Sequence, residues 1–206
     1  MDIIRPIVAA GALLLFSIGA SAGDFEASSF GQRYTARNCA WCHGVSGQGI
    51  ATAPRLAGQK SEYIVRQMLD FRTHARDNPK SQQYMWAAVR YLNADIANEV
   101  AAYLAALAPQ AANDGDAGLA AKGEAIYKDG DIAANVPSCV ACHGPNAEGT
   151  GSIPRLGGLS HRYLRRRLEQ WGQGYHVSAA AQMPSIATSL SNDNIESLSS
   201  YLSFVH

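Results

Sequence analysis

The four cysteines of the chain lie in two short segments with the same spacing, "NCAWCHG" at 38–44 and "SCVACHG" at 138–144. In each segment two residues separate the cysteines and a histidine follows directly, which is the pattern for covalent attachment of c-type haem. The two thiols add across the vinyl groups of the porphyrin, and the histidine binds the iron. The sequence therefore predicts two haem c groups, held by Cys39, Cys42 and His43 and by Cys139, Cys142 and His143.

Other uses of paired cysteines explain these segments less well. A disulfide framework gives no reason for the histidine after each pair. Two C-x-x-C pairs separated by about a hundred residues are further apart than in a zinc ribbon, and a thioredoxin-like motif would accompany a βαβ pattern that is not visible here. Haem attachment accounts for every cysteine and for both histidines.

The repeat extends beyond the cysteines and indicates a domain duplication. "PRLAG" at 54–58 corresponds to "PRLGG" at 154–158, and Tyr63 corresponds to Tyr163, all at an offset of 100 residues. The stretch "APQAANDGDAGLAA" is polar, rich in Ala and Gly, and without a clear period, so it is interpreted as a linker. The predicted units are a signal peptide at 1–22, a first haem domain at 23–107, a linker at 108–118 and a second haem domain at 119–206.

Both halves show helical patterns and no run of alternating strand residues. Residues 62–72 and 162–171 carry apolar side chains at helical spacing. The last segment of each half begins with a plausible N-cap, Asn93 or Ser191, and has an Asp in its first turn. We therefore expect an all-α fold with long loops that pack on the haem.

The methionines supply the predicted second ligand of each iron. Met85 and Met183 correspond to each other at an offset of 98, after a loop and before the last helix of each half. Met68 corresponds to Leu168, so core packing is the better interpretation of this side chain. We predict Met85 and Met183 as the distal ligands, the alternative being that one of them packs against its haem and leaves the iron open.

The remaining histidines have no counterpart in the other half and are interpreted as surface or loop residues, namely His74, His161, His176 and His206. His176 is the best rival to Met183. Four arginines also gather at 162–167, and helical geometry places three of them on one face: Arg162, Arg165 and Arg166. This face is either a docking surface for an acidic partner or a face whose arginines contact their own protein.

The N-terminal residues have the pattern of an export signal. Arg5 precedes an apolar run at 7–19, and "ASA" at 20–22 is a small-residue cleavage site. The alternative is an uncleaved anchor, although a 13-residue run is short for a spanning helix. We expect a periplasmic protein, soluble or loosely associated with the membrane. The formal net charge of zero argues against a nucleic-acid partner.

The paired C-x-x-C-H motifs, the P-x-L-x-G after each and the final "LSSYLSFVH" resemble the cytochrome c4 family, dihaem proteins built of two tandem class I cytochrome c domains. The resemblance implies that helices wrap one covalent haem in each domain and that the domains pack about a pseudo-twofold axis. It also implies that the carbonyls of Pro54 and Pro154 orient the proximal histidines. Arg55 and Arg155 would contact propionates or lie at the surface.

Histidine and methionine ligation raises a haem potential and leaves no open position for a substrate. The predicted function is therefore electron transfer without catalysis, with no small-molecule substrate. The carrier would move electrons from a quinol-oxidising complex or a dehydrogenase to a terminal oxidase or reductase, through brief contacts with redox protein partners.

Two alternatives stay open. One is a dihaem enzyme, although the chain is short for a peroxidase and lacks the additional cysteine that serves as an axial ligand in some thiosulfate dehydrogenases. The other is a dedicated electron-transfer subunit of a larger dehydrogenase complex that oxidises sulfide or thiosulfate.

Overall fold

The computed structural model describes residues 29–50, 52–176 and 182–206, and these form helices joined by loops, with two isolated β-bridges. The predicted all-α fold is confirmed. The predicted signal peptide at 1–22 lies outside the described residues. Within the described part of the chain, none of the helices has the length and apolar character needed to span a bilayer.

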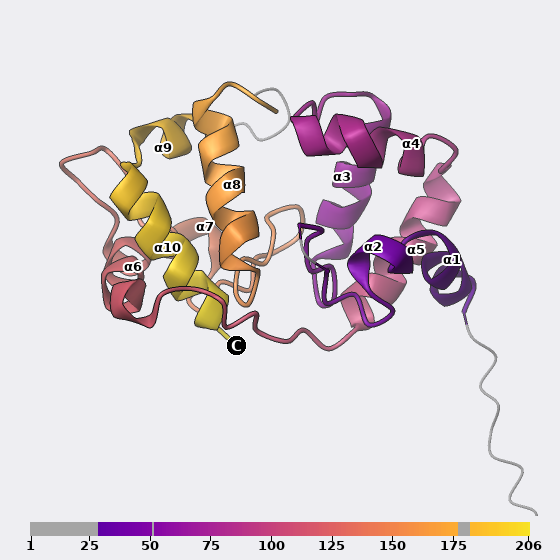
Figure 1. The fold of residues 1–206 in the computed structure, drawn as a ribbon, viewed down its shortest axis with the longest axis horizontal. Helices are drawn as coiled ribbons and strands as arrows, with labels where there is room; N and C mark the ends of the chain where they lie inside the picture. The colour runs from indigo at the N-terminus through magenta and orange to yellow at the C-terminus, as the bar shows by residue number, and fades with distance from the viewer. Residues whose placement is uncertain (1–28, 51, 177–181) are drawn as a thin grey trace, which may run out of the picture.

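The two halves contain corresponding sets of helices, and the halves lie side by side in Figure 1. The first half contains α1 (Phe30–Asn38), α2 (Ala40–His43), α3 (Ser61–Arg72), the π-helical turn η1 (Ser81–Met85), α4 (Trp86–Val89) and α5 (Ala94–Ala106). The second contains α6 (Ala117–Asp129), α7 (Val140–His143), α8 (His161–Gly172), α9 (Met183–Ser189) and α10 (Asn192–Phe204).

The last helix of each half begins at the residue predicted to cap it. The Asn93 side chain accepts a hydrogen bond from the Ile96 amide at 2.9 Å, and Ser191 Oγ accepts one from the Asn194 amide at 3.1 Å. Each cap satisfies an amide that has no partner inside the helix, which typically stabilises a protein by about 1 kcal/mol. The caps thereby fix where α5 and α10 start.

A glycine allows the first helix of each half to cross the last helix closely. A Cβ atom on Gly31 in α1 would lie 2.1 Å from the carbonyl oxygen of Glu99 in α5. A Cβ on Gly123 in α6 would lie 2.0 Å from the carbonyl oxygen of Ser197 in α10. No side chain fits at these distances, so glycine is required at both crossings.

The apolar cores lie inside each half rather than between them. In the second half, Tyr127 and Leu198 belong to one cluster of buried residues. In the first half, Met68 packs against two clusters, one around Leu104 and one around Phe71. The prediction that Met68 serves core packing is confirmed.

The two halves meet through polar side chains carried largely by α3 and α8, which face each other in Figure 1. Tyr63 lies next to its repeat counterpart Tyr163, and Arg76 Nη2 donates to the Tyr163 hydroxyl at 3.3 Å. Contact between two equivalent residues is what an approximate twofold axis produces.

His176 lies in this interface and is only 3% exposed. Its amide donates to Asp77 Oδ1 at 2.8 Å, its Nε2 lies 3.3 Å from Asp70 Oδ2, and its Nδ1 accepts from Arg167. His176 does lie in the loop after α8, as one of the two interpretations had it, but it is not at the surface. The sequence gives no sign of this burial, because Asp70 and Asp77, the carboxylate partners of His176, are about a hundred positions away.

The arginines of α8 divide between solvent and the interface. Arg162 is exposed, and Arg165 pairs with Glu169 and Glu196 at 2.9 and 3.2 Å. Arg166 instead donates to the carbonyl of Thr52 in the other half at 2.9 Å, and Arg167 is buried. The predicted cationic face is thus reduced, because Arg166 is used inside the molecule.

Candidate haem sites

Each C-x-x-C-H motif forms a single helical turn. The amide of His43 donates to the carbonyl of Cys39 at 2.9 Å, and the amide of His143 donates to that of Cys139 at 2.9 Å. All four cysteines are free thiols, and Cys42 and Cys142 are exposed. One turn of helix therefore carries both thiols and the imidazole of each motif.

The histidine of each motif is buried and held by a proline carbonyl. His43 is 6% exposed with Nδ1 2.8 Å from the carbonyl oxygen of Pro54, and His143 is 7% exposed with Nδ1 3.0 Å from that of Pro154. Since a carbonyl only accepts, Nδ1 carries the proton and the lone pair remains on Nε2. The carbonyl contacts implied by the family resemblance are confirmed.

Burial lowers the pKa of both imidazoles, and the hydrogen bond to the proline carbonyl opposes this only in part. Neutral imidazole with a free Nε2 is the form that binds iron. A hydrogen-bond acceptor on Nδ1 also fixes the ring orientation and increases the basicity of the ligand. The two histidines therefore have the protonation state and restraint that a proximal haem ligand requires.

The proline-containing loops fold back against their motifs. The amide of Gly49 donates to the carbonyl of His43 at 2.8 Å, and the amide of Leu56 donates to that of Gly47 at 2.7 Å. Gly149 and Leu156 make the equivalent bonds to His143 and Ala147, both at 2.8 Å. Local backbone bonds therefore place each proline carbonyl beside its histidine.

The two methionines start or end a helical element in corresponding positions. Met85 is the last residue of the π-helical turn η1, is half-buried, and packs against the cluster of Phe71, Val89 and Leu92. Met183 is the first residue of α9 and is also half-buried. Single π-helical turns occur frequently at functional sites. Iron ligation by Met85 and Met183 stays a prediction.

Buried cations near the contact between the halves fit the two propionates that a haem carries. Arg76, Arg155 and Arg167 are each less than 9% exposed, and the Nε atoms of Arg76 and Arg155 lack a hydrogen-bond partner. Burial, and after it the neighbouring Arg55, lowers the pKa of Arg155 to about 10. Arg155 is therefore buried rather than at the surface, and an anionic group would relieve its desolvation.

The thiols and imidazoles do not form a site for a bare metal ion. Across 29–50, 52–176 and 182–206, no three His, Cys, Asp or Glu side chains converge as metal ligands. Haem c binds its two thiols at the porphyrin edge and its imidazole at the iron, so these three side chains do not need to converge on one point. The donor set therefore fits haem c.

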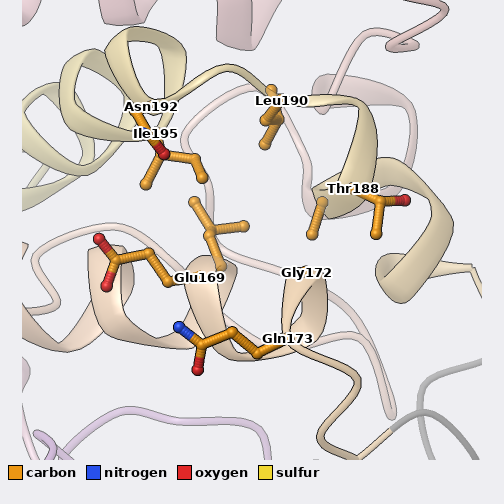
Figure 2. A pocket seen from close by; sticks show the side chains of 9 residues that line it. Glu169, Gly172, Gln173, Thr188, Leu190, Asn192 and Ile195 are labelled. Carbon is orange, nitrogen blue, oxygen red and sulfur yellow. The ribbon is translucent and has the colours of Figure 1, made fainter.

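A shallow pocket between α8, α9 and α10 is lined by none of the predicted site residues. Figure 2 shows Glu169 and Gln173 on one side of it and Thr188, Leu190 and Ile195 on the other. A second pocket lies between α3 and α5 of the first half. Both pockets are separate from the haem motifs.

The sequence analysis missed the polar residues that join the two halves. Gln59 is 4% exposed, and its side chain bonds to the backbone of Arg155 in the other half. A signal was present in the repeat, because the counterpart of Gln59 is the apolar Leu159. A polar residue that replaces a core residue at one of two equivalent positions indicates a contact that only one half makes.

Comparison with known proteins agrees with the site geometry. A family model described as cytochrome c matches residues 29–108 and 120–205. The chain is 37% identical to the thiosulfate dehydrogenase electron acceptor of Stutzerimonas stutzeri, over 97% of this chain and 94% of that protein. It is 33% identical to cytochrome c4 of Pseudomonas aeruginosa, over 93% and 94%.

A solved structure of cytochrome c4 from Acidithiobacillus ferrooxidans has a TM-score of 0.76 and 29% identity, covering 81% of this chain and 98% of that one. The predicted tandem class I cytochrome c domains, the two haem c groups and the role as a dihaem electron carrier are thereby confirmed. The chain belongs to the cytochrome c family and, within it, to the dihaem cytochrome c4 proteins.

Proposed function

We propose that each motif holds one haem through its two thiols and its histidine, with Met85 as distal ligand in the first domain and Met183 in the second. The buried, carbonyl-bonded histidine of each motif carries this proposal, because its Nε2 is the free donor atom. The haem supplies a one-electron couple when bound. The protein residues fix the imidazole, keep its proton on Nδ1 and exclude water from it.

We also propose the domain limits 23–107 and 119–206 with a linker at 108–118, and export to the periplasm after cleavage behind residue 22. The segment 108–118 is supported as a linker by its contacts, because the amide of Ala112 donates to Gly158 and that of Asn113 to Ser203. Its residue Gln110 contacts the first domain, since its amide donates to Gln48 Oε1 at 3.2 Å, so the segment passes from one domain to the other. Mass analysis of the natural protein would test the cleavage site.

We propose that the protein has no catalytic activity of its own and exchanges electrons with redox protein partners. Two methionine-ligated irons leave no coordination position for a substrate. The donor would be a quinol-oxidising complex or a dehydrogenase, and the acceptor a terminal oxidase or reductase. Relatives named cytochrome c4 and an electron acceptor of thiosulfate dehydrogenase support carriage rather than catalysis.

The alternative of a dedicated partner for thiosulfate oxidation has specific support. The relative with 37% identity is named for accepting electrons from thiosulfate dehydrogenase. The experiment compares reduction of the oxidised dihaem protein by thiosulfate alone, by thiosulfate with thiosulfate dehydrogenase, and by a quinol with a quinol-oxidising complex. Reduction only in the second mixture supports the dedicated role, and reduction in the third supports the general carrier. Turnover of thiosulfate by the protein alone would show that it is an enzyme.

A further inference from the structure

The peptide group between Pro154 and Arg155 takes part in hydrogen bonds with both domains. Its carbonyl oxygen accepts from Nδ1 of His143 at 3.0 Å, and its amide donates to Oε1 of Gln59 at 2.7 Å. The carbonyl and the amide hydrogen of a trans peptide point in opposite directions. A continuous hydrogen-bond chain therefore runs from the proximal histidine of the second domain, through one peptide group, to a glutamine of the first domain.

Gln59 is fixed in place on both sides. Its Nε2 donates to the carbonyl of Arg155 at 2.9 Å, and its Oε1 also accepts from the amide of Lys60 at 2.9 Å. Arg155 in turn reaches back, with Nη2 2.8 Å from the carbonyl oxygen of Ala57. Both Gln59 and Arg155 are buried, so water does not replace these bonds.

The first domain has no equivalent of this chain. The residue at the position equivalent to Gln59 is Leu159, whose side chain has no hydrogen-bonding atom, and which is 3% exposed in the core of the second domain. The carbonyl of Pro54 still accepts from His43. The two proximal histidines therefore have the same immediate partner but differ in what lies behind it.

We propose that Gln59 is a positioning residue for the second haem, acting through the Pro154–Arg155 peptide on His143. An acceptor on the amide polarises the peptide group and makes its carbonyl a stronger acceptor. A stronger acceptor draws the Nδ1 proton of His143 away and increases the electron donation of the imidazole to iron. Increased donation stabilises ferric iron, so the first domain lowers the reduction potential of the second haem. This inference rests on the proposed ligand role of His143.

The experiment uses the full dihaem protein with two variants of nearly equal size. Gln59→Met fills the same space but offers the Arg155 amide no oxygen. Gln59→Glu keeps an acceptor oxygen, and if it is protonated its hydroxyl also donates to the Arg155 carbonyl. A Met85→His variant, which lowers the potential of the haem that residue 85 ligates, identifies which step of the redox titration belongs to the first domain.

We expect Gln59→Met to raise the potential of the second haem and to leave that of the first unchanged. Mutation of a group that hydrogen bonds directly to a metal-bound histidine typically changes metal affinity or activity by about 10- to 100-fold. Gln59 is one hydrogen bond further from His143 than such a direct partner, so we expect about a threefold change in the one-electron equilibrium constant. At about 59 mV for each factor of ten, this corresponds to roughly 28 mV in the reduction potential. Gln59→Glu should not raise the potential.

Nuclear magnetic resonance of the reduced protein gives a second readout that does not depend on electron transfer. In Gln59→Met the Nδ1 proton of His143 should move upfield, and the amide of Arg155 should exchange with solvent faster. The proton of His43 should not move. A merely structural role for Gln59 predicts lower thermal stability with the His143 proton and the second potential unchanged.

The inference is overturned if Gln59→Met retains both haems and yet leaves the second potential and the His143 proton unchanged, or if both potentials move equally. Failure of the proposed function has a different result. In that event Met85→His leaves both potentials unchanged, or replacement of His143 leaves the second haem spectrum unchanged.

Discussion

Replacing Gly123 by Ala tests the close crossing of α6 and α10. The added Cβ would lie 2.0 Å from the carbonyl oxygen of Ser197, 2.6 Å from its carbon and 2.7 Å from Cβ of Tyr201. Carbon atoms in contact are normally about 3.5–4.0 Å apart, so the helices must separate by roughly 1 Å or more. Both atoms nearest the new methyl group belong to backbone, which cannot change rotamer to make space.

The expected cost follows from two opposing effects. Overpacking by one methyl group typically costs about 1–3 kcal/mol, and the upper end applies because backbone must move. Alanine regains about 1 kcal/mol of helix propensity relative to glycine. The net destabilisation is about 2 kcal/mol, which lowers the melting temperature of a domain of this size by roughly 8–16 °C.

The assay is thermal unfolding of the dihaem protein, followed by circular dichroism in the far ultraviolet and by haem absorbance. Gly172→Ala is the matched control, because Gly172 ends helix α8 and a Cβ there meets nothing within 4 Å. This control should be as stable as the unmodified protein or slightly more so. If Gly123→Ala is as stable as Gly172→Ala, the close crossing of α6 and α10 is wrong.

Three further predictions concern the haems and the interface. Protein denatured on a gel should keep its haem colour, and its mass should be that of the chain plus two haems. The variant Cys139→Ala should lose or weaken haem attachment only in the second domain. Full attachment in that variant would contradict the assignment. Methionine-ligated haem has a weak red absorption band in the oxidised protein, and Met85→Ala and Met183→Ala should each remove about half of it. Met68→Leu should leave the band intact. Loss of the band in Met68→Leu would show that Met68, and not Met85, is the ligand in the first domain. Burial lowers the pKa of His176, so the unfolded chain binds a proton more readily, and stability should fall as pH drops below about 6.5. His176→Gln should flatten this fall in denaturant titrations between about pH 7 and 5, and an unchanged slope would show that His176 does not contribute.

The local features of this protein could be predicted from its sequence. The two haem motifs, the caps at Asn93 and Ser191 and the packing role of Met68 each depend on neighbours in the chain or on a comparison between repeats. The environment of His176 could not be predicted, because its partners Asp70 and Asp77 are brought to it by the packing of one domain on the other.

The same distinction explains what was missed at the haem sites. The proline carbonyls follow the motifs closely in sequence, and the family resemblance implied their contacts with the histidines. Gln59 contacts a peptide 96 residues away. Periodicity and motif spacing carry no information about such a contact, although the Gln59–Leu159 difference between repeats marked the position as unusual.

The contact between Tyr63 and Tyr163 has a consequence for the symmetry of the molecule. Equivalent residues that meet on an axis are the mark of an isologous homodimer, in which one surface must be complementary to itself. A single gene encoding such a dimer cannot place Gln59 on one side and Leu159 on the other. A chain that carries both copies is free of that restriction, and it keeps the second copy permanently available at high effective concentration. The unequal surroundings of the two proximal histidines are therefore possible in one chain with two copies and not in a symmetric homodimer of a single haem domain.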